Sequence, residues 1–127
     1  MTPTVRLFTT LGAVAAMLAV VLGAFGAHAL RARLTPEMLT VYHTATQYHF
    51  YHALGLLLVA LLAAQFPAVG ALRVAGWLMV IGIVLFSGSL YALSLTGVRW
   101  LGAITPLGGA AFIAAWAVVA CGALRRG

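Results

Sequence analysis

Residues 42–55 read YHTATQYHFYHALG and join a polar, titratable segment to the apolar run 53–64. The stretch holds three of the four histidines and three of the four tyrosines in the chain. Titratable side chains are unfavourable where a helix enters the hydrocarbon of a membrane, and by default they indicate a functional site. The stretch therefore predicts a membrane helix with polar chemistry at its start.

The composition of the whole chain agrees with a membrane location. Of 127 residues, 65% are hydrophobic and 6% are charged, whereas soluble domains carry about 25% charged residues. The basic residues are all arginine, and Glu37 is the only acid. The arginines stand at the ends of apolar runs, which is typical of lipid headgroup anchoring and not of a basic surface for nucleic acid. We therefore expect the lipid bilayer as a partner, and no nucleic acid.

Four apolar runs have the length of membrane spans. They cover about residues 7–27, 48–66, 74–95 and 101–124, and a helix of about 20 residues crosses roughly 30 Å of hydrocarbon. The first run is longer than the 7–15 apolar residues of a signal peptide, so we expect it to be a span and not a cleaved leader. The prediction is an all-α integral membrane bundle of four transmembrane helices, a single domain over residues 1–127.

Residues 36–47 precede the second span and are more polar than a lipid-embedded helix. Thr35, Pro36 and Glu37 form a good helix start, with an N-cap, a proline at the first position and an acid in the first turn. One straight helix over 36–65 would measure roughly 45 Å, more than the hydrocarbon needs. We therefore predict a short interfacial helical segment before the second span. Pro67 is expected to end that span, and Pro106 to bend or open the start of the fourth.

The number of spans and the arginines predict the topology. Four spans put both termini on one side of the membrane, with Arg6, Arg73, Arg125 and Arg126 on that side. The three remaining arginines, at positions 31, 33 and 99, fall on the other side. Because positive charge is retained in the cytoplasm, this favours cytoplasmic termini.

By this topology, the polar side chains of the spans gather within about three turns of the side away from the termini. They form a candidate polar cluster or ligand-binding site made of His28, Tyr48, His49, His52, Ser87, Ser89, Tyr91 and Thr105. His49 and His52 share a helix face and, with His28, are the candidates for metal binding. Such histidines can hold a metal, supply an axial ligand to haem or bond to a quinone oxygen. Helix packing and interfacial anchoring explain the same residues without a ligand.

Four sequence blocks resemble a known family. They are GAFGAH at 23–28, Tyr48 with His52-Ala53-Leu54, LFSGSLY at 85–91 and TPLGG at 105–109. Together they resemble the YgdD-like family, "domain of unknown function 423", of small bacterial inner-membrane proteins related to the eukaryotic transmembrane protein 256. The resemblance implies a multi-pass inner-membrane protein and brings no activity, substrate or cofactor. Its pattern coincides with the candidate cluster and with Pro106, except that His49 is a less regular member.

The sequence contains no catalytic constellation, so we expect no enzyme, and it requires no cofactor. The leading interpretation is a small multi-pass inner-membrane protein of unknown molecular function. It would act as a non-enzymatic accessory or interaction subunit, with another membrane protein or a second copy as partner. One alternative is a site for haem, metal or quinone lined by histidine and tyrosine. A second alternative is a passage for protons or small solutes, which would need polar lining across the whole bilayer.

Overall fold

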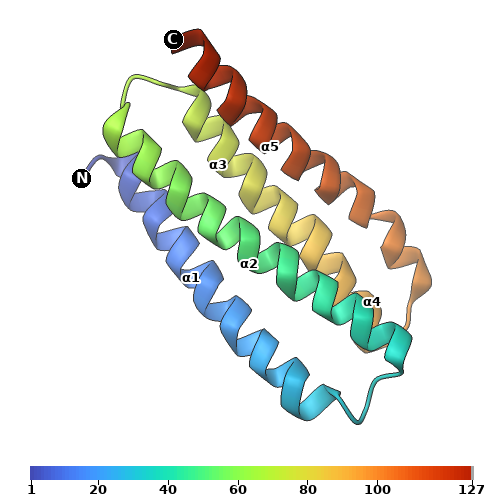
Figure 1. Ribbon diagram of the computed structural model, residues 1–127. Helices are drawn as coiled ribbons and strands as arrows, with labels where there is room; N and C mark the ends of the chain where they lie inside the picture. Colours follow the sequence, from blue (N-terminus) through green and yellow to red (C-terminus); the bar gives the residue numbers. More distant parts are fainter. Residues whose placement is uncertain (127) are drawn as a thin grey trace.

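The computed structural model describes residues 1–126, which form helices and no strands (Figure 1). In chain order the elements are α1 (Pro3–Phe25), a π-helical segment (Gly26–Leu30), α2 (Pro36–Gln65), α3 (Ala71–Gly82), a second π-helical segment (Ile83–Ser87), α4 (Gly88–Thr96), a 3-10 segment (Arg99–Ala103) and α5 (Thr105–Arg126). Consecutive elements join into four continuous helices that are long and apolar enough to cross a membrane: Pro3–Leu30, Pro36–Gln65, Ala71–Thr96 and Arg99–Arg125. This confirms the all-α, four-span bundle.

The helices start and stop where local chemistry requires it. Thr35 caps α2, since its Oγ1 accepts a hydrogen bond from the backbone N–H of Met38 at 3.2 Å. At the other end of α2, Phe66 leaves the helical conformation with φ −129° and ψ 66°, because a residue before proline, here Pro67, disfavours the α region. Gly97 ends α4 at φ +75°, a conformation that glycine adopts without strain.

The polar segment 36–47 is the first part of α2, which runs without a break from Pro36 to Gln65. It packs upright along α1, because Tyr42 is fully buried there. A Cβ added to Gly26 would lie 2.3 Å from the Tyr42 ring, so only glycine allows this contact. His49 and His52 therefore lie about 20–24 Å from the start of α2, near the middle of the bundle and not at its surface.

Of the two effects expected of Pro106, the structure has a local opening at the start of the fourth span, where a 3-10 segment precedes the α-helix. Pro106 is the second residue of α5, which begins at Thr105 after the 3-10 segment Arg99–Ala103. In the first turn of a helix a backbone N–H has no intrahelical acceptor, so a proline, which lacks this N–H, removes no hydrogen bond there.

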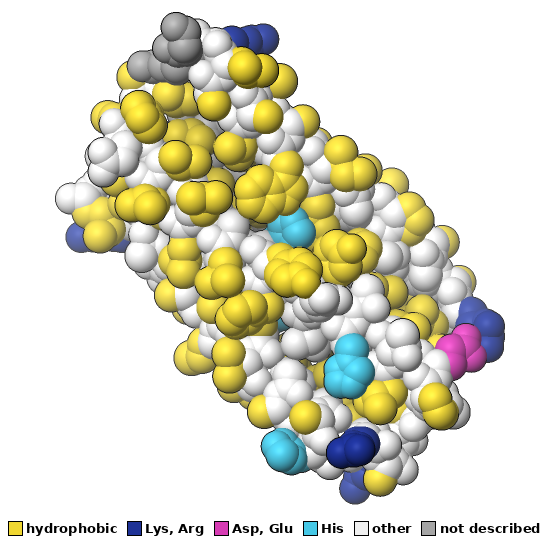
Figure 2. All heavy atoms as spheres, in the orientation of Figure 1, with side chains coloured by type: hydrophobic (Ala, Val, Ile, Leu, Met, Phe, Trp, Pro, Cys, Tyr) yellow, Lys and Arg dark blue, Asp and Glu magenta, His cyan; other side chains and the backbone are white. Residues whose placement is uncertain are grey.

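The helices run side by side, and both termini lie at one end of the bundle (Figure 1). The connections α1–α2 and α4–α5 lie at the opposite end. In Figure 2 the basic side chains gather toward the two ends of the visible face, and hydrophobic and uncharged side chains occupy the length between them. The most hydrophobic stretch of α2 is 44% buried, against 17–28% in the other three spans. α2 is therefore the central helix.

Apolar and polar interiors occupy different parts of this length. The apolar core fills the half nearer the termini and includes Val5, Phe8, Leu56, Val59, Ala60, Ala63, Leu72, Ala75, Met79 and Ala115. The buried polar residues of the described chain lie from mid-depth toward the connections, and they are His49, His52, Ser87, Ser89 and Ser94. Polar chemistry inside the bundle is thus confined to one part of it.

Candidate functional site at mid-depth of the bundle

His52 is held by hydrogen bonds at both ring nitrogens. Its Nδ1 lies 2.8 Å from the carbonyl oxygen of Tyr48, one turn earlier in α2. Its Nε2 lies 3.0 Å from the indole nitrogen of Trp116 in α5. Because an indole N–H can only donate and a carbonyl can only accept, His52 must be the neutral tautomer with its proton on Nδ1. In this arrangement neither nitrogen is free to bind a metal or haem.

Aromatic rings enclose the same histidine. The rings of His52 and Phe112 stack with centroids 3.5 Å apart at an angle of 10°. The Tyr48 ring lies nearly parallel to both, with its centroid 6.4 Å from that of His52 and 6.5 Å from that of Phe112. Phe112 itself fits against Gly82, where an added Cβ would lie 2.3 Å from its ring. Packing and hydrogen bonding therefore fix His52 in a single orientation between α2, α3 and α5.

His49 belongs to a second polar group, on the α1 side of α2. Its Nδ1 lies 2.9 Å from the hydroxyl of Tyr91 in α4, and that hydroxyl lies 3.5 Å from Oγ1 of Thr46. The Tyr91 ring meets the Tyr42 ring edge to face, with centroids 5.3 Å apart. The Tyr42 hydroxyl donates to the carbonyl of Leu22 in α1. These contacts connect α1, α2 and α4 through polar groups in an apolar environment.

A groove of about 420 Å³ passes over this group between α1 and the α3–α4 unit. Its lining comprises Leu11, Val14, Ala15, Leu18, His49, Leu56, Val80, Ile83, Val84, Gly88 and Tyr91. Only His49 and Tyr91 among these bring polar side-chain atoms. The π-helical segment Ile83–Ser87 forms part of one wall, and such widened turns are frequent at functional sites. The groove has the volume and the largely apolar lining that are typical of small-molecule sites.

The serines and Thr105 lie on the α5 side. Ser89 Oγ is 2.6 Å from Thr105 Oγ1, which joins α4 to the start of α5. Ser94 Oγ donates to the carbonyl of Tyr91 within its own helix. Ser87 is fully buried in the π-helical segment, and its Oγ has no hydrogen-bond partner. These three serines thus differ: one joins helices, one bonds locally and one has no polar contact.

The eight candidates consequently divide into separate groups. His52 and Tyr48 belong to the aromatic group, His49 and Tyr91 to the groove, and Ser89 and Thr105 to the α4–α5 contact. Ser87 belongs to none of them, since its hydroxyl has no hydrogen-bond partner. His28 is exposed near the end of the first helical unit. Within residues 1–126, no three His, Cys, Asp or Glu side chains come close enough to share a metal ion. His28, His49 and His52 therefore do not form a metal centre.

The register of α1 against α2 explains why His28 is remote. Gly23 lies against Thr46, and Gly12 lies against Ala53 and Leu57. In antiparallel helices with this register, His28 stands opposite about residue 40 of α2, roughly 18 Å short of His52 along the axis.

Sequence reasoning missed three residues that hold the site together: Trp116, Tyr42 and Thr46. Trp116 had a visible signal, because a tryptophan in the middle of a span is far from the interfacial belt and needs a partner for its N–H. The sequence predicts Tyr42 and Thr46 to lie in the interfacial segment, because that segment is polar. No sequence signal shows that this segment packs on α1.

Residues 22–109 match the family model "Protein of unknown function (DUF423)". The UPF0382 membrane protein YwdK of Bacillus subtilis (strain 168) is 55% identical over 120 residues, which cover 94% of this chain and 98% of that protein. The UPF0382 membrane protein SERP0230 of Staphylococcus epidermidis is 48% identical over 94% and 97% of the two chains.

A third relative, the UPF0382 membrane protein SSP2132 of Staphylococcus saprophyticus, is 45% identical over 94% of this chain and 98% of its own. No solved structure matches the chain. The relatives are membrane proteins by name, in agreement with the four spans and a bilayer environment. The family match and these near full-length identities confirm the resemblance, and the chain belongs to the DUF423 family of UPF0382 membrane proteins.

Proposed function

We propose that this protein is a non-enzymatic accessory protein of the bacterial plasma membrane that binds a quinone-type lipid in the groove at His49 and Tyr91. The observation that carries the proposal is the pairing of these two side chains, 2.9 Å apart, in an otherwise apolar groove. A quinone has an apolar tail and ring carbonyls that accept hydrogen bonds. The groove supplies apolar walls for the former and one polar position for the latter.

The choice of a quinone over haem or metal follows from the state of the histidines. Both nitrogens of His52 are engaged, and one nitrogen of His49 faces Tyr91. His52 therefore has no unoccupied nitrogen to serve as an axial ligand to haem, only the second nitrogen of His49 could do so, and a metal would need several ligands together. A hydrogen-bonded organic ligand needs only a donor, which an N–H of His49 or the O–H of Tyr91 can provide.

The test is equilibrium binding of decylubiquinone and a short-chain menaquinone to protein in nanodiscs. Tyr91→Phe removes the hydroxyl and keeps the ring, and we expect about 5- to 10-fold weaker binding, since one hydrogen bond contributes roughly 1 kcal/mol. The matched control is Tyr51→Phe, because Tyr51 is 51% exposed and does not line the groove.

A second variant tests the groove without touching polar groups. Gly88 lines it, and an added Cβ there would have its nearest neighbour at 4.0 Å, so Gly88→Val should fold and reduce the space for a ligand. Loss of binding in both Tyr91→Phe and Gly88→Val supports the proposal. Equal binding by these variants, Tyr51→Phe and the unchanged protein contradicts it, as does absence of saturable binding to the unchanged protein.

A further inference from the structure

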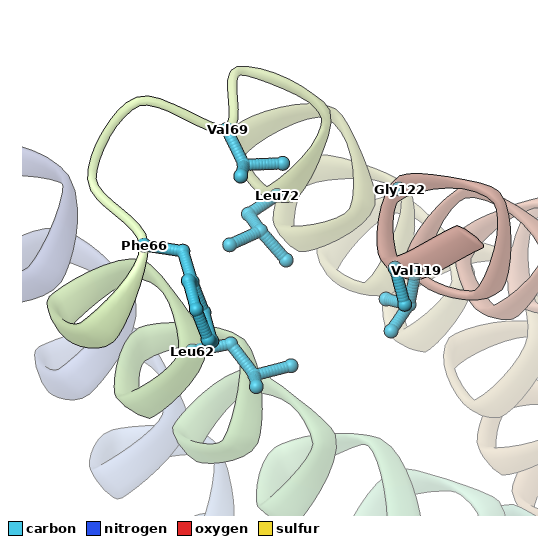
Figure 3. Close-up of a pocket in the computed structure, with 7 residues that line it drawn as sticks. Leu62, Phe66, Val69, Leu72, Val119 and Gly122 are labelled. Carbon is cyan, nitrogen blue, oxygen red and sulfur yellow. The ribbon is translucent and has the colours of Figure 1, made fainter. Parts of the chain in front are cut away.

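A second cavity lies at the end of the bundle that carries both termini. Its volume is about 300 Å³, and its lining consists of Leu62, Phe66, Val69, Leu72, Val119, Gly122 and Ala123. Figure 3 shows these side chains around a space bounded by the end of α2, the α2–α3 connection, the start of α3 and the last turns of α5. None of the lining side chains is polar. Phe66 is 50% exposed, so the cavity is accessible from outside.

Two arginines stand close in the sequence to residues that line this cavity, and no acidic side chain stands at this end of the bundle. Arg73 follows the lining residue Leu72 in the first turn of α3, and Arg125 stands one helical turn after Gly122 in α5. Both are exposed. The only acid of the chain, Glu37, begins α2 at the opposite end of the bundle. No Asp or Glu side chain of this chain therefore stands at the end that carries these two guanidinium groups.

The apolar cavity and the two arginines together indicate the chemical class of the ligand. An apolar cavity at the depth of the first and last helical turns suits an acyl chain, and arginines at the membrane surface attract an anionic phosphodiester. Arginine side chains are long enough to cover apolar surface while their charged ends stay at the headgroup level. A zwitterionic lipid would fill the cavity with an acyl chain but would not compensate the positive charge of the two arginines.

We propose that the cavity between α2, α3 and α5 binds one anionic phospholipid, with an acyl chain in the cavity and its phosphodiester on Arg73 and Arg125. This site shares no lining residue with the groove at His49 and Tyr91, which lies nearer mid-depth, so either proposal can fail without the other. Its ligand class is also different, because recognition here depends on charge.

The experiment is native mass spectrometry of the full chain released from nanodiscs that contain phosphatidylglycerol and phosphatidylcholine in equal amounts. We expect one phosphatidylglycerol per chain to be retained in preference to phosphatidylcholine. Near a membrane surface each basic residue strengthens binding about fivefold, so Arg73→Gln with Arg125→Gln should reduce retention on the order of 20- to 30-fold. Arg31→Gln with Arg99→Gln, at the opposite end, is the control with matched charge.

A second variant tests the acyl chain. A Cβ at Gly122 would make ordinary contacts at 3.6 Å with Ala71 and 3.7 Å with Val69. Gly122→Ala should therefore retain the lipid, and Gly122→Leu should displace it by filling the cavity. Glycerophosphoglycerol, the headgroup without acyl chains, should not compete.

Three results would overturn the proposal. They are equal retention of the two lipids, equal loss in both double-arginine variants, and unchanged retention in Gly122→Leu. Circular dichroism and gel filtration identify a variant that fails to fold, and the other variant then decides the question.

Discussion

Trp116 in α5 donates its indole N–H to Nε2 of His52 in α2 across 3.0 Å, and the two residues are 64 positions apart in the chain. This contact joins two helices that are not neighbours in sequence. It also uses the one nitrogen of His52 that its own helix leaves free, because Nδ1 donates to the Tyr48 carbonyl. The histidine acts here as a bridge between helices.

The first prediction concerns the tautomer of His52. We expect nitrogen-15 NMR of the protein with labelled histidine to show a protonated Nδ1 and an unprotonated Nε2 at neutral pH, because Trp116 can only donate. Assignment is made by comparison with Trp116→Phe, in which the Nε2 signal should move. A protonated Nε2 in the unchanged protein would contradict the geometry described above.

Loss of the Trp116 donor should destabilise the bundle. Trp116→Phe keeps an aromatic ring beside His52 but leaves Nε2 without a partner, and we expect a loss of about 1–2 kcal/mol in free energy of unfolding. Trp100→Phe is the control, since Trp100 is 67% exposed. Unfolding in mixed micelles measures both variants, and a similar small effect in each would count against a bridging role.

Two adjacent glycines should respond oppositely to the same change. A Cβ at Gly108 would lie 2.2 Å from the backbone nitrogen of Phe86, whereas one at Gly109 would lie 3.8 Å from the Phe86 ring. Gly108→Ala should thus force α5 away from the π-helical segment and destabilise the protein by about 1–3 kcal/mol or more. Gly109→Ala should be neutral or slightly stabilising, because alanine favours helix. Thermal unfolding in detergent checks the pair, and equal effects would refute the close approach.

Ser89 and Thr105 should be energetically coupled. Their hydroxyls lie 2.6 Å apart across the α4–α5 contact, and such bonds between membrane helices contribute on average about 0.6 and at most about 1.7 kcal/mol. A double-mutant cycle with Ser89→Ala and Thr105→Val should return a coupling energy in this range. The pair Ser94→Ala and Thr105→Val should return none, since Ser94 bonds within its own helix. Additive effects of Ser89→Ala and Thr105→Val would show that the hydroxyl contact is not a stabilising interaction.

The orientation of the chain is open to a direct test. Both termini lie at one end of the bundle (Figure 1), and four of the seven arginines belong to that end. We expect green fluorescent protein to be fluorescent when fused at either terminus, because it folds in the cytoplasm, and alkaline phosphatase fused there to be inactive. The opposite pattern at both ends would reverse the predicted orientation, and a mixed pattern would contradict the four-span topology.

Much of the fold follows from local sequence. Apolar runs of about 20 residues predict membrane helices wherever they occur, and four of them predict the bundle and the common side of the termini. Thr35, Pro67 and Gly97 mark ends of helices through capping, steric restriction and left-handed geometry, which depend on a few adjacent residues. The confinement of buried polar groups to one part of the bundle also follows from where they stand along each span.

Which residues make up the site depends on how the helices pack against one another. The depth of His49 and His52 depends on α2 running upright from Pro36, which in turn depends on the Tyr42 ring fitting against Gly26 of another helix. That contact, the Trp116–His52 bond and the separation of His28 from both histidines are set by the register between helices. Hydropathy predicts the number and length of the helices, because whether a segment is apolar enough to lie in lipid depends on that segment alone. Register depends on which ring fits which glycine on a neighbouring helix, and only the packed bundle determines that.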